Sequence, residues 1–337
     1  MGPKTMTATQ IGHYGQHDVD RVLLPIPQPA PGEVLVKIQA ASINPIDLKT
    51  RDGKMRPLLH YRLPLTLGSD LAGDVAAVGE GVTDFHVGDP VYGRVMKDHI
   101  GTFAEYITIA AAALAPMPQT VTYAAAAALP LVSLTAYQAL HDILRVGPGQ
   151  KVLIQAGAGG IGTVAIQLAK TLGAYVATTT SAAHRPLVQQ LGADQVIDYH
   201  QDRFDVVLHD YDAVLDTLGG DNLRRGFTIL KPGGRIVSVA GLPNRRFAQA
   251  TGRPLWQRTL FTLTGWPLSR LERQYHVRYT FLFMQPSGRQ LQTIGELVDS
   301  GQLHPVIDRV VSFTDIQRAL DYSETGHARG KIVVTMA

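Results

Sequence analysis

One stretch decides the fold: Lys151-Val-Leu-Ile-Gln-Ala-Gly-Ala-Gly-Gly-Ile-Gly-Thr-Val-Ala-Ile-Gln-Leu-Ala-Lys170. Val152–Ile154 is the continuous apolar run that is typical of a parallel strand buried on both faces. The glycines that follow have the G-x-G-x-x-G spacing, which permits a tight turn, close approach of a pyrophosphate and close packing of the next helix. The free amides at the start of that helix point at the turn. We therefore predict a dinucleotide site whose contacts are Gly157, Gly159, Gly160, Ile161 and Gly162.

A glycine turn of purely structural character is the alternative interpretation of this stretch. The chain after it favours nucleotide binding, because Gly173 and a second strand-like run, Ala174–Thr179, complete a strand, helix and strand unit. Such alternation continues to about Val239 and predicts a doubly wound parallel sheet. The expected strands are 151–155, 174–179, 196–197, 213–216, 235–239 and 279–283, and the expected helices are 134–144, 163–172, 186–191, 222–230 and 290–297.

The first third of the chain has a different character. Short strand-like runs, most clearly Val34–Ala40, Asp70–Gly79 and Tyr106–Ile109, are separated by prolines and glycines. This pattern predicts a small β-rich domain. The strand-like run Lys331–Thr335 near the end of the chain also needs a partner in some sheet.

Composition agrees with a packed enzyme of about two domains. The chain has 337 residues, of which 45% are hydrophobic and 18% charged, and a domain holds roughly 150 residues. The absence of cysteine excludes disulfides, thiol catalysis and thiolate metal sites. No apolar run approaches the ~20 residues of a membrane span, and Met1–Gln10 lacks the apolar core of a signal peptide. We therefore expect a cytoplasmic protein without a membrane partner.

The net charge of +3 and the pI near 9.0 raise the question of nucleic acid. The most basic cluster consists of Arg245, Arg246, Arg253 and Arg258. Because these residues are not interleaved with a set of stacking aromatic side chains, we interpret the cluster as a solvated loop. No nucleic-acid partner is expected.

Further motifs are spread over nearly the whole chain, at Pro31–Lys37, Ala41–Asp47, Leu67–Gly73, Val87–Gly93, Leu129–Gln138 and Arg329–Val334. Together with the glycine turn, they resemble the medium-chain dehydrogenase/reductase superfamily. The resemblance is closest to its zinc-free quinone oxidoreductase branch, which includes zeta-crystallin and the plant enone reductases. It implies an α/β fold in which a GroES-like β-rich catalytic domain, residues 1–127 and 287–337, is interrupted by a Rossmann nucleotide domain, residues 128–286. This arrangement gives the last strand its partner.

The residues also bear on zinc. Zinc enzymes of this superfamily use a catalytic cysteine and a Gly-His-Glu where this chain has Gly68-Ser69-Asp70. A catalytic zinc needs three protein ligands and a structural zinc four. Twelve histidines leave a His-carboxylate site conceivable, but His13, His60, His86, His99 and His141 do not have ligand spacing. We expect no metal. Since alcohol oxidation then lacks its usual Lewis acid, the expected chemistry is reduction of an electrophilic acceptor.

The segment after the second predicted strand favours NADPH over NADH. NAD sites place an acidic residue about 20 residues after the glycine turn, but residues 177–186 contain none. The basic pair just before Pro186 stands at a helix start, where positive charge is unfavourable unless a phosphate binds there. The alternative to a phosphate site is that the basic pair is a solvated helix start and that Tyr199 is an aromatic plug. The resemblance assigns the 2′-phosphate to a small residue, a basic residue and a tyrosine, which here are Thr180 or Ser181, His184 with Arg185, and Tyr199.

Other cofactor contacts follow from the rule that ligands bind beyond the carboxyl ends of parallel strands. The residues that this rule selects are Leu218, Ala240, Gly241, Phe281 and Phe283. The resemblance adds Thr135 on the nicotinamide side and Lys331 on the phosphate side. Each of these two has a structural alternative, since Thr135 suits a helix start and Lys331 suits a strand-end charge that snorkels to solvent.

Three residues are candidates for the acceptor site. Asn44 is suited to hydrogen-bond the nicotinamide ribose or the acceptor carbonyl, although an Asn-Pro pair also favours a turn. Asp47 is expected to orient Asn44 or a backbone loop. Tyr61 lies in a segment broken by proline and glycine and is expected to stack on a flat acceptor, with an exposed loop aromatic as the alternative.

These interpretations lead to two hypotheses. The first is a zinc-independent NADPH-dependent reductase that transfers hydride to quinones or α,β-unsaturated carbonyls. The second is an NADPH-binding regulatory or interaction protein with little turnover. In either case the family resemblance implies a homodimer, and the strand at 279–283 would leave an unpaired sheet edge that a two-fold axis can close.

Overall fold

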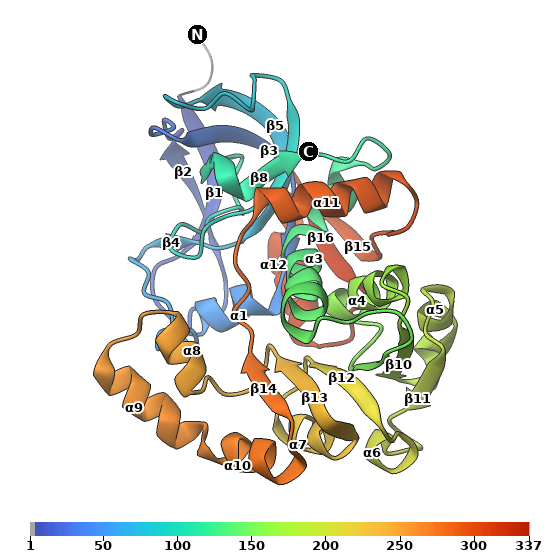
Figure 1. Cartoon of the computed structure of the whole chain (residues 1–337). Helices are drawn as coiled ribbons and strands as arrows, with labels where there is room; N and C mark the ends of the chain where they lie inside the picture. The colour runs from blue at the N-terminus through green and yellow to red at the C-terminus, as the bar shows by residue number, and fades with distance from the viewer. Residues whose placement is uncertain (1–3, 337) are drawn as a thin grey trace. The chain divides into compact units, whose positions relative to one another are not determined.

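The computed structural model describes residues 4–336, and within them the chain forms two compact units (Figure 1). The first unit holds the chain up to Leu134 and from Gln285 onward, and the second holds Thr135–Met284. The sequence predicts a catalytic domain of residues 1–127 and 287–337 and a nucleotide domain of residues 128–286. These functional bounds remain a prediction, because the two units are defined by compactness alone. Among residues 4–336, no helix is both long and apolar enough to span a membrane.

The second unit contains a six-stranded sheet in which every neighbouring pair of strands is parallel. Apolar side chains on both faces of the central strands are fully buried, as in Val152, Leu153 and Ile154. The predicted parallel sheet is thus confirmed. In spatial order its strands are β11 (Gln195–Asp198), β10 (Tyr175–Thr180), β9 (Lys151–Ile154), β12 (Tyr211–Asp216), β13 (Leu230–Ser238) and β14 (Arg278–Phe281).

Helices cover both faces of this sheet. On β13, Ile236 points at α7 (Gly220–Thr228), where a side chain at Gly226 would collide with it. The neighbouring Arg235 points to the other face, since successive strand residues alternate, and donates to the Leu144 carbonyl of the π-helix η2 (Gln138–Leu144) at 3.2 Å. The remaining helical segments of this unit are α4 (Gly160–Thr171), η3 (Ala182–His184), α5 (Arg185–Gln190), α6 (Phe204–Val207), α8 (Arg245–Ala250), α9 (Leu255–Thr264) and α10 (Trp266–Tyr275).

The expected solvated loop around Arg245–Arg258 is wrong, because this region is helical. The side chain of Asn244 caps α8 by accepting a hydrogen bond from the Phe247 amide at 3.0 Å. Phe247 then packs edge-on against Phe281, with ring centroids 5.1 Å apart. The expectation of a loop rested on the charges of the arginines alone. The structure is determined instead by the cap at Asn244 and by the packing of Phe247 and Phe281.

The first unit is β-rich, as predicted. Its larger sheet has the order β15 (Ile307–Ser312), β16 (Lys331–Thr335), β3 (Glu33–Ile43), β5 (Asp70–Val78), β6 (Pro90–Arg94) and β8 (Leu114–Pro116), with β7 (Tyr106–Ala110) also paired to β3. The smaller sheet consists of β2 (Asp20–Pro25), β1 (Thr5–Ile11) and β4 (Leu65–Thr66). The helical segments are α1 (Pro45–Arg51), η1 (Ala111–Ala113), α2 (Tyr123–Ala127), the start of α3 (Pro130–Tyr137), α11 (Gly288–Asp299), η4 (Phe313–Asp315) and α12 (Ile316–Glu324).

Strand register in the larger sheet brings distant polar residues together. The pairing of β3 with β5 sets Ser42 opposite Asp70. The pairing of β3 with the last strand sets Ile43 opposite Ile332, so that Asn44 and Lys331 are neighbours although 287 residues separate them. The predicted final strand has thus found its partner in the N-terminal sheet.

Candidate functional site

The glycine turn forms the start of α4, and its three glycines have different surroundings. A Cβ atom on Gly157 would lie 2.1 Å from the Thr178 hydroxyl oxygen, and one on Gly162 would lie 2.3 Å from the Ala156 carbonyl oxygen. Both positions must therefore remain without a side chain for the turn to pack. A Cβ atom on Gly159 would meet only the Ala156 carbonyl, at 3.3 Å. The turn thus leaves space at the N-terminus of a twelve-residue helix, where a pyrophosphate is favoured.

The residues expected at a 2′-phosphate gather at the carboxyl ends of β10 and β11. The Tyr199 amide donates to the Thr180 carbonyl at 3.3 Å, and Ser181 Oγ lies 3.4 Å from His184 Nδ1. The Tyr199 side chain is 60% exposed. Arg185 is exposed at the start of α5, and among residues 4–336 no hydrogen bond or ion pair engages its guanidinium. Residues 177–186, at the end of β10, therefore hold the exposed Arg185 and no acidic side chain. The nearest acidic residue in the register of the sheet is the buried Asp198 of β11, which accepts from the His200 amide at 3.1 Å.

The loop after β12 is held by a carboxylate that the sequence analysis missed. Asp216 is completely buried, and its carboxylate accepts hydrogen bonds from the amides of Leu218 at 3.2 Å and Gly219 at 2.9 Å. Burial raises the pKa of this carboxyl, while the hydrogen bonds from Ser238 and these amides oppose that effect. The bonds fix the backbone around Leu218, whose side chain is 49% exposed.

Ser238 connects this loop to the one after β13. Its hydroxyl donates to Asp216 and accepts from the amides of Ala240 at 3.1 Å and Gly241 at 2.7 Å. Both proposed contact loops are therefore braced by one Asp–Ser pair. The only signal in the sequence is that Asp216 is the last residue of one predicted strand and Ser238 the penultimate residue of another. This signal can be interpreted only when the two strands are known to be neighbours.

The other cofactor candidates of the second unit are less exposed. Phe281 and Phe283 both pack edge-on against Phe247, with centroid separations of 5.1 and 6.3 Å. Thr135 is buried. The structure therefore places the two phenylalanines in an aromatic cluster at the carboxyl end of β14.

In the first unit, six buried polar residues form a connected group that we call the Asn44 cluster. Its members are Ser42, Asn44, Asp47, Ser69, Asp70 and Lys331. The side-chain nitrogen Nδ2 of Asn44 donates to Asp70 Oδ2 at 2.9 Å, and its Oδ1 accepts from Lys331 Nζ. Lys331 Nζ also donates to the Ile43 carbonyl at 3.1 Å. Because the Asn44 side chain is held from both sides, its orientation is fixed.

The snorkelling alternative for Lys331 is wrong. The side chain is buried, and Nζ lies 3.6 Å from Asp70 Oδ2. Burial lowers the pKa of this lysine, and the nearby carboxylates of Asp70 and Asp47 act against that effect. The lysine is directed inward because β16 is a central strand of the sheet, with β15 and β3 on its two sides.

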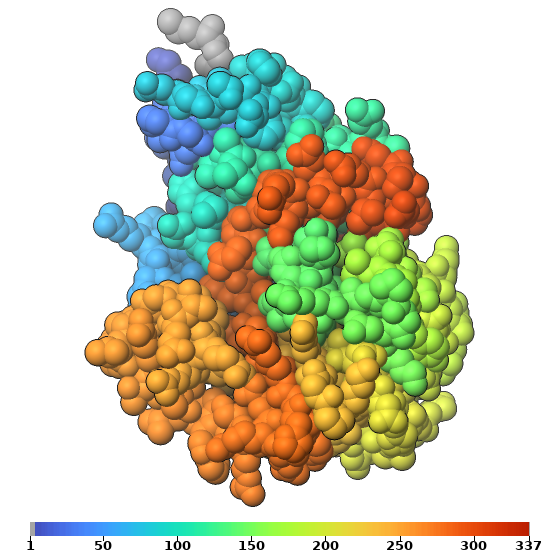
Figure 2. Space-filling view, in the orientation of Figure 1, coloured from blue at the N-terminus to red at the C-terminus, as the bar shows by residue number. Residues whose placement is uncertain are grey.

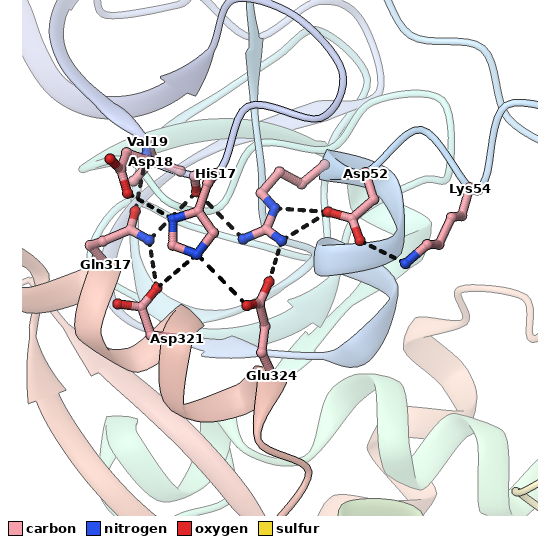
Figure 3. A network of polar contacts seen from close by, with 9 residues as sticks. His17, Asp18, Val19, Asp52, Lys54, Gln317, Asp321 and Glu324 are labelled. Carbon is pink, nitrogen blue, oxygen red and sulfur yellow. Dashed lines mark hydrogen bonds and ion pairs between the residues drawn. The ribbon is translucent and has the colours of Figure 1, made fainter.

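Helix α1 carries Asn44 and Asp47 at one end and is anchored at the other. Asp47 Oδ2 accepts from the backbone amide of Asn44, the N-cap residue, at 2.8 Å. At the far end, the buried Arg51 forms ion pairs with Asp52 and with Glu324 of α12 (Figure 3). His17 faces the same carboxylate of Glu324 at 3.7 Å. Asp47 is therefore part of a helix cap, as expected of a residue that orients Asn44.

Tyr61 lies outside the hydrogen-bonded Asn44 cluster. Its ring is partly buried against the core of the first unit, and its hydroxyl donates to the Lys97 carbonyl at 2.6 Å. Burial raises the pKa of Tyr61 to about 12. A freely exposed loop aromatic is thus excluded, while a role in stacking stays a prediction.

Asp47 gives the first unit a specific pH dependence. Burial, aided by the charge of Asp70, raises the pKa of Asp47 from 3.8 to about 7, against the hydrogen bond from the Asn44 amide. Between pH 3.8 and about pH 7, Asp47 is more often protonated in the folded state than in the unfolded state. The free energy of unfolding therefore falls as pH rises through this range. We expect Asp47→Asn to remove this decline. Urea unfolding from pH 4 to pH 7 measures it.

The matched control is the exposed Asp84, whose substitution Asp84→Asn removes a carboxyl from a loop. Its unfolding free energy should follow that of the unmodified protein across the whole range. If Asp47→Asn also followed the unmodified protein, Asp47 would not hold a proton in the folded state.

No group of three or more His, Asp or Glu side chains within residues 4–336 is arranged to hold a metal ion. The chemistry-bearing residues of the two units are instead hydrogen-bonding and cationic groups. In the second unit they line the carboxyl edge of a parallel sheet, which is where nucleotides bind in such folds.

Comparison with known proteins identifies the family. Residues 30–119 match the alcohol dehydrogenase GroES-like domain, and residues 191–334 match the zinc-binding dehydrogenase domain. The mouse mitochondrial NAD(P)H oxidoreductase RTN4IP1 is 35% identical over 98% of this chain and 89% of its own length. The chloroplastic NADPH-dependent alkenal/one oxidoreductase of Arabidopsis thaliana is 31% identical over 98% of this chain and 80% of its own.

A solved structure agrees with these relatives. The quinone oxidoreductase of Coxiella burnetii is 34% identical, covers 99% of this chain and 100% of its own, and superimposes with a TM-score of 0.84. The match includes the GroES-like and Rossmann parts expected from the motifs. The chain therefore belongs to the medium-chain dehydrogenase/reductase superfamily, in its branch of quinone and enone reductases.

Proposed function

We propose that this oxidoreductase is a zinc-independent, NADPH-dependent reductase of quinones or α,β-unsaturated carbonyls. The observation that carries the proposal is the carboxyl edge of the parallel sheet, where an open glycine turn precedes α4 and where residues 177–186, at the end of β10, hold the exposed Arg185 and no acidic side chain. The names of the relatives, which include a quinone oxidoreductase and an alkenal/one oxidoreductase, support the acceptor class. The lack of cysteine and the Gly68-Ser69-Asp70 sequence support independence from zinc.

The chain's own residues bind and orient. The amides at the start of α4 suit a pyrophosphate, and Arg185, with Ser181, His184 and Tyr199 nearby, suits a 2′-phosphate. NADPH, when bound, supplies a hydride from C4 of its nicotinamide. The Asp216–Ser238 pair keeps the two contact loops rigid. The Asn44 cluster holds the Asn44 amide in a fixed orientation at the acceptor side, with Tyr61 as a further contact. Lys331, which the resemblance places on the phosphate side of the cofactor, donates to that amide's oxygen.

Arg185→Ala tests the choice of cofactor. Because the guanidinium has no partner among residues 4–336, its removal should leave folding intact. We expect the KM for NADPH to rise about tenfold or more, as charge-assisted contacts to phosphate are worth ~1.5–3 kcal/mol, while the KM for NADH stays nearly unchanged. Steady-state kinetics with both cofactors provides the measurement.

The matched control for this variant is Arg224→Ala, on the exposed side of α7. It should alter neither KM. Equal changes of both Michaelis constants in Arg185→Ala would contradict the phosphate assignment.

The acceptor class is tested with purified, chelator-treated protein. NADPH consumption is measured against a benzoquinone, an ortho-quinone and a simple enone, with NADH in parallel. Turnover that prefers NADPH supports the proposal and identifies the better acceptor. Saturable NADPH binding without turnover on any of them would instead support the regulatory or interaction protein.

Assembly and location complete the proposal. β14 is an edge strand of its sheet, and two such edges joined across a two-fold axis would satisfy their unpaired backbone groups. We propose a homodimer, which a monomeric mass in light scattering would contradict. We also propose a cytoplasmic location. The mouse and Arabidopsis relatives named above are mitochondrial and chloroplastic by name, so cell fractionation tests this location directly.

A further inference from the structure

The charge of the chain is strongly segregated. Residues 241–284, which contain α8, α9, α10 and β14, hold seven arginines and a single acidic residue, Glu272, a formal charge of +6. The whole chain carries +3, so the remaining residues sum to −3. The surface of these helices is the orange area at the lower left of Figure 2. The segment is thus a basic surface on an otherwise slightly acidic protein.

Helix α9 presents an apolar face to solvent on this basic segment. Trp256, Leu260 and Leu263 follow one another at helical spacing and are 65%, 44% and 69% exposed. Phe261 and Gln257 are on the buried side of the same helix. A helix with one buried and one exposed apolar face lacks a partner for the second.

Helix α10 continues this face and adds charge. Trp266 is 55% exposed at its first position, and Arg270 and Arg273 follow at spacings of four and seven residues, so all three share one stripe. All three are exposed. Trp256 and Trp266 are the two tryptophans of the chain. Both therefore lie on the exposed surface of the most basic segment. We call the set Trp256, Leu260, Leu263, Trp266, Arg270 and Arg273 the α9–α10 stripe.

A hollow beside the stripe is basic as well. It has a volume of about 530 Å³ and is lined by Arg246, Arg273, Arg278 and His276, together with Glu272. Glu272 is already engaged, because it pairs with Arg246 and accepts from the Tyr279 amide at 2.7 Å. Arg273 and Arg278 therefore line the hollow without a further acidic residue in its lining. Such a site suits an anionic headgroup.

These features distinguish between possible occupants of the stripe. A second copy docked stripe to stripe would set Arg270 and Arg273 against the same two arginines, so self-association through the stripe, as distinct from pairing of two β14 edges, is opposed. Nucleic acid would match the charge but would leave the Leu260 and Leu263 side chains without an apolar partner. An anionic lipid surface matches both, since tryptophan and leucine insert at the headgroup boundary while arginine remains at the phosphates.

We propose that the α9–α10 stripe docks this protein on anionic lipid bilayers. Docking is peripheral: α9 lies in the interface with Trp256, Leu260 and Leu263 inserted, and Arg270 and Arg273 contact lipid phosphates. This inference goes beyond the reductase activity and does not depend on it. It differs from the expectation of no membrane partner, and vesicle binding decides between the two.

Vesicle binding of the full-length protein tests the proposal. The probes are vesicles of phosphatidylcholine alone and of phosphatidylcholine with phosphatidylglycerol. Because both tryptophans lie on the stripe, intrinsic fluorescence reports insertion directly. We expect a blue shift and co-sedimentation only with phosphatidylglycerol, weakened by added salt. Leu260→Ser/Leu263→Ser and Arg270→Glu/Arg273→Glu should each weaken binding at least tenfold, with the rate on a water-soluble quinone unchanged.

Matched variants control for hydrophobicity and charge. Leu23→Ser/Val87→Ser removes two exposed apolar side chains elsewhere, and Arg289→Glu/Arg318→Glu makes the same change in net charge on the first unit. Both should bind vesicles like the unmodified protein. Three results would overturn the proposal: equal loss in these controls, no binding to phosphatidylglycerol, or a concentration-dependent blue shift without vesicles, which would indicate that a second copy covers the stripe.

Discussion

Gly162→Val is expected to abolish measurable NADPH binding. A Cβ atom at this position would lie 2.3 Å from the Ala156 carbonyl oxygen and 2.7 Å from Gly157 Cα, and both of these atoms are backbone. Relief of the collision requires the turn to move away from α4, which displaces the amides that suit the pyrophosphate. Overpacking of this kind costs ~1–3 kcal/mol or more. We expect NADPH affinity to fall at least 100-fold in calorimetric titration, together with a lower melting temperature.

Gly147→Val is the matched control for this variant. No atom lies within 4 Å of a Cβ built on Gly147, which belongs to the same unit. This variant should therefore bind NADPH with nearly unchanged affinity. Retained affinity in Gly162→Val would mean that the turn does not hold the nucleotide.

Lys331→Met is expected to have the second-largest effect, on stability. The lysine is buried against Asn44 and Asp70, so its replacement leaves Asp70 and Asn44 Oδ1 without their cation. Removal of one partner from a buried ion pair costs ~3–5 kcal/mol. Because the cation also orients Asn44, we expect any variant protein that folds to turn over its acceptor more slowly. Urea unfolding measures the first effect and kcat the second.

Lys231→Met provides the comparison, since Lys231 forms an ion pair with Asp212 but is half exposed. Exposed pairs contribute about 0–1 kcal/mol. A loss in Lys331→Met no greater than that in Lys231→Met would contradict the structural role assigned to the cluster.

The parts of the fold that depend on local pattern were predictable from the sequence. The glycine turn, the buried run before it and the alternation after it lead to β9, α4 and β10 at nearly the expected residues. The family assignment is confirmed by the comparisons, because its motifs span both units. The individual cofactor and acceptor residues stay predictions, as does the preference for NADPH.

The parts that depend on long-range register were not predictable in the same way. Lys331 is next to Asn44 because β16 pairs with β3 in one register, and no local pattern in either segment specifies that contact. The Asp216–Ser238 brace likewise requires that β12 and β13 be neighbours. Helices α8 and α9 were not predicted, because the interpretation of this segment rested on its arginines. The cap at Asn244 and the apolar positions Phe247 and Phe261 were not taken into account.

The central claim is that this chain directs a hydride from NADPH to an electron-poor carbonyl compound without a metal. The most direct measurement is a single turnover of chelator-treated protein with NADPH deuterated at C4 and a simple enone, followed by mass and NMR analysis of the product. We expect one deuterium at the β-carbon, delivered from one face of the cofactor, at a rate consistent with steady-state turnover. The claim of direct hydride transfer would be contradicted if the protein bound NADPH saturably, but no deuterium entered the enone product and quinones did not oxidise the cofactor.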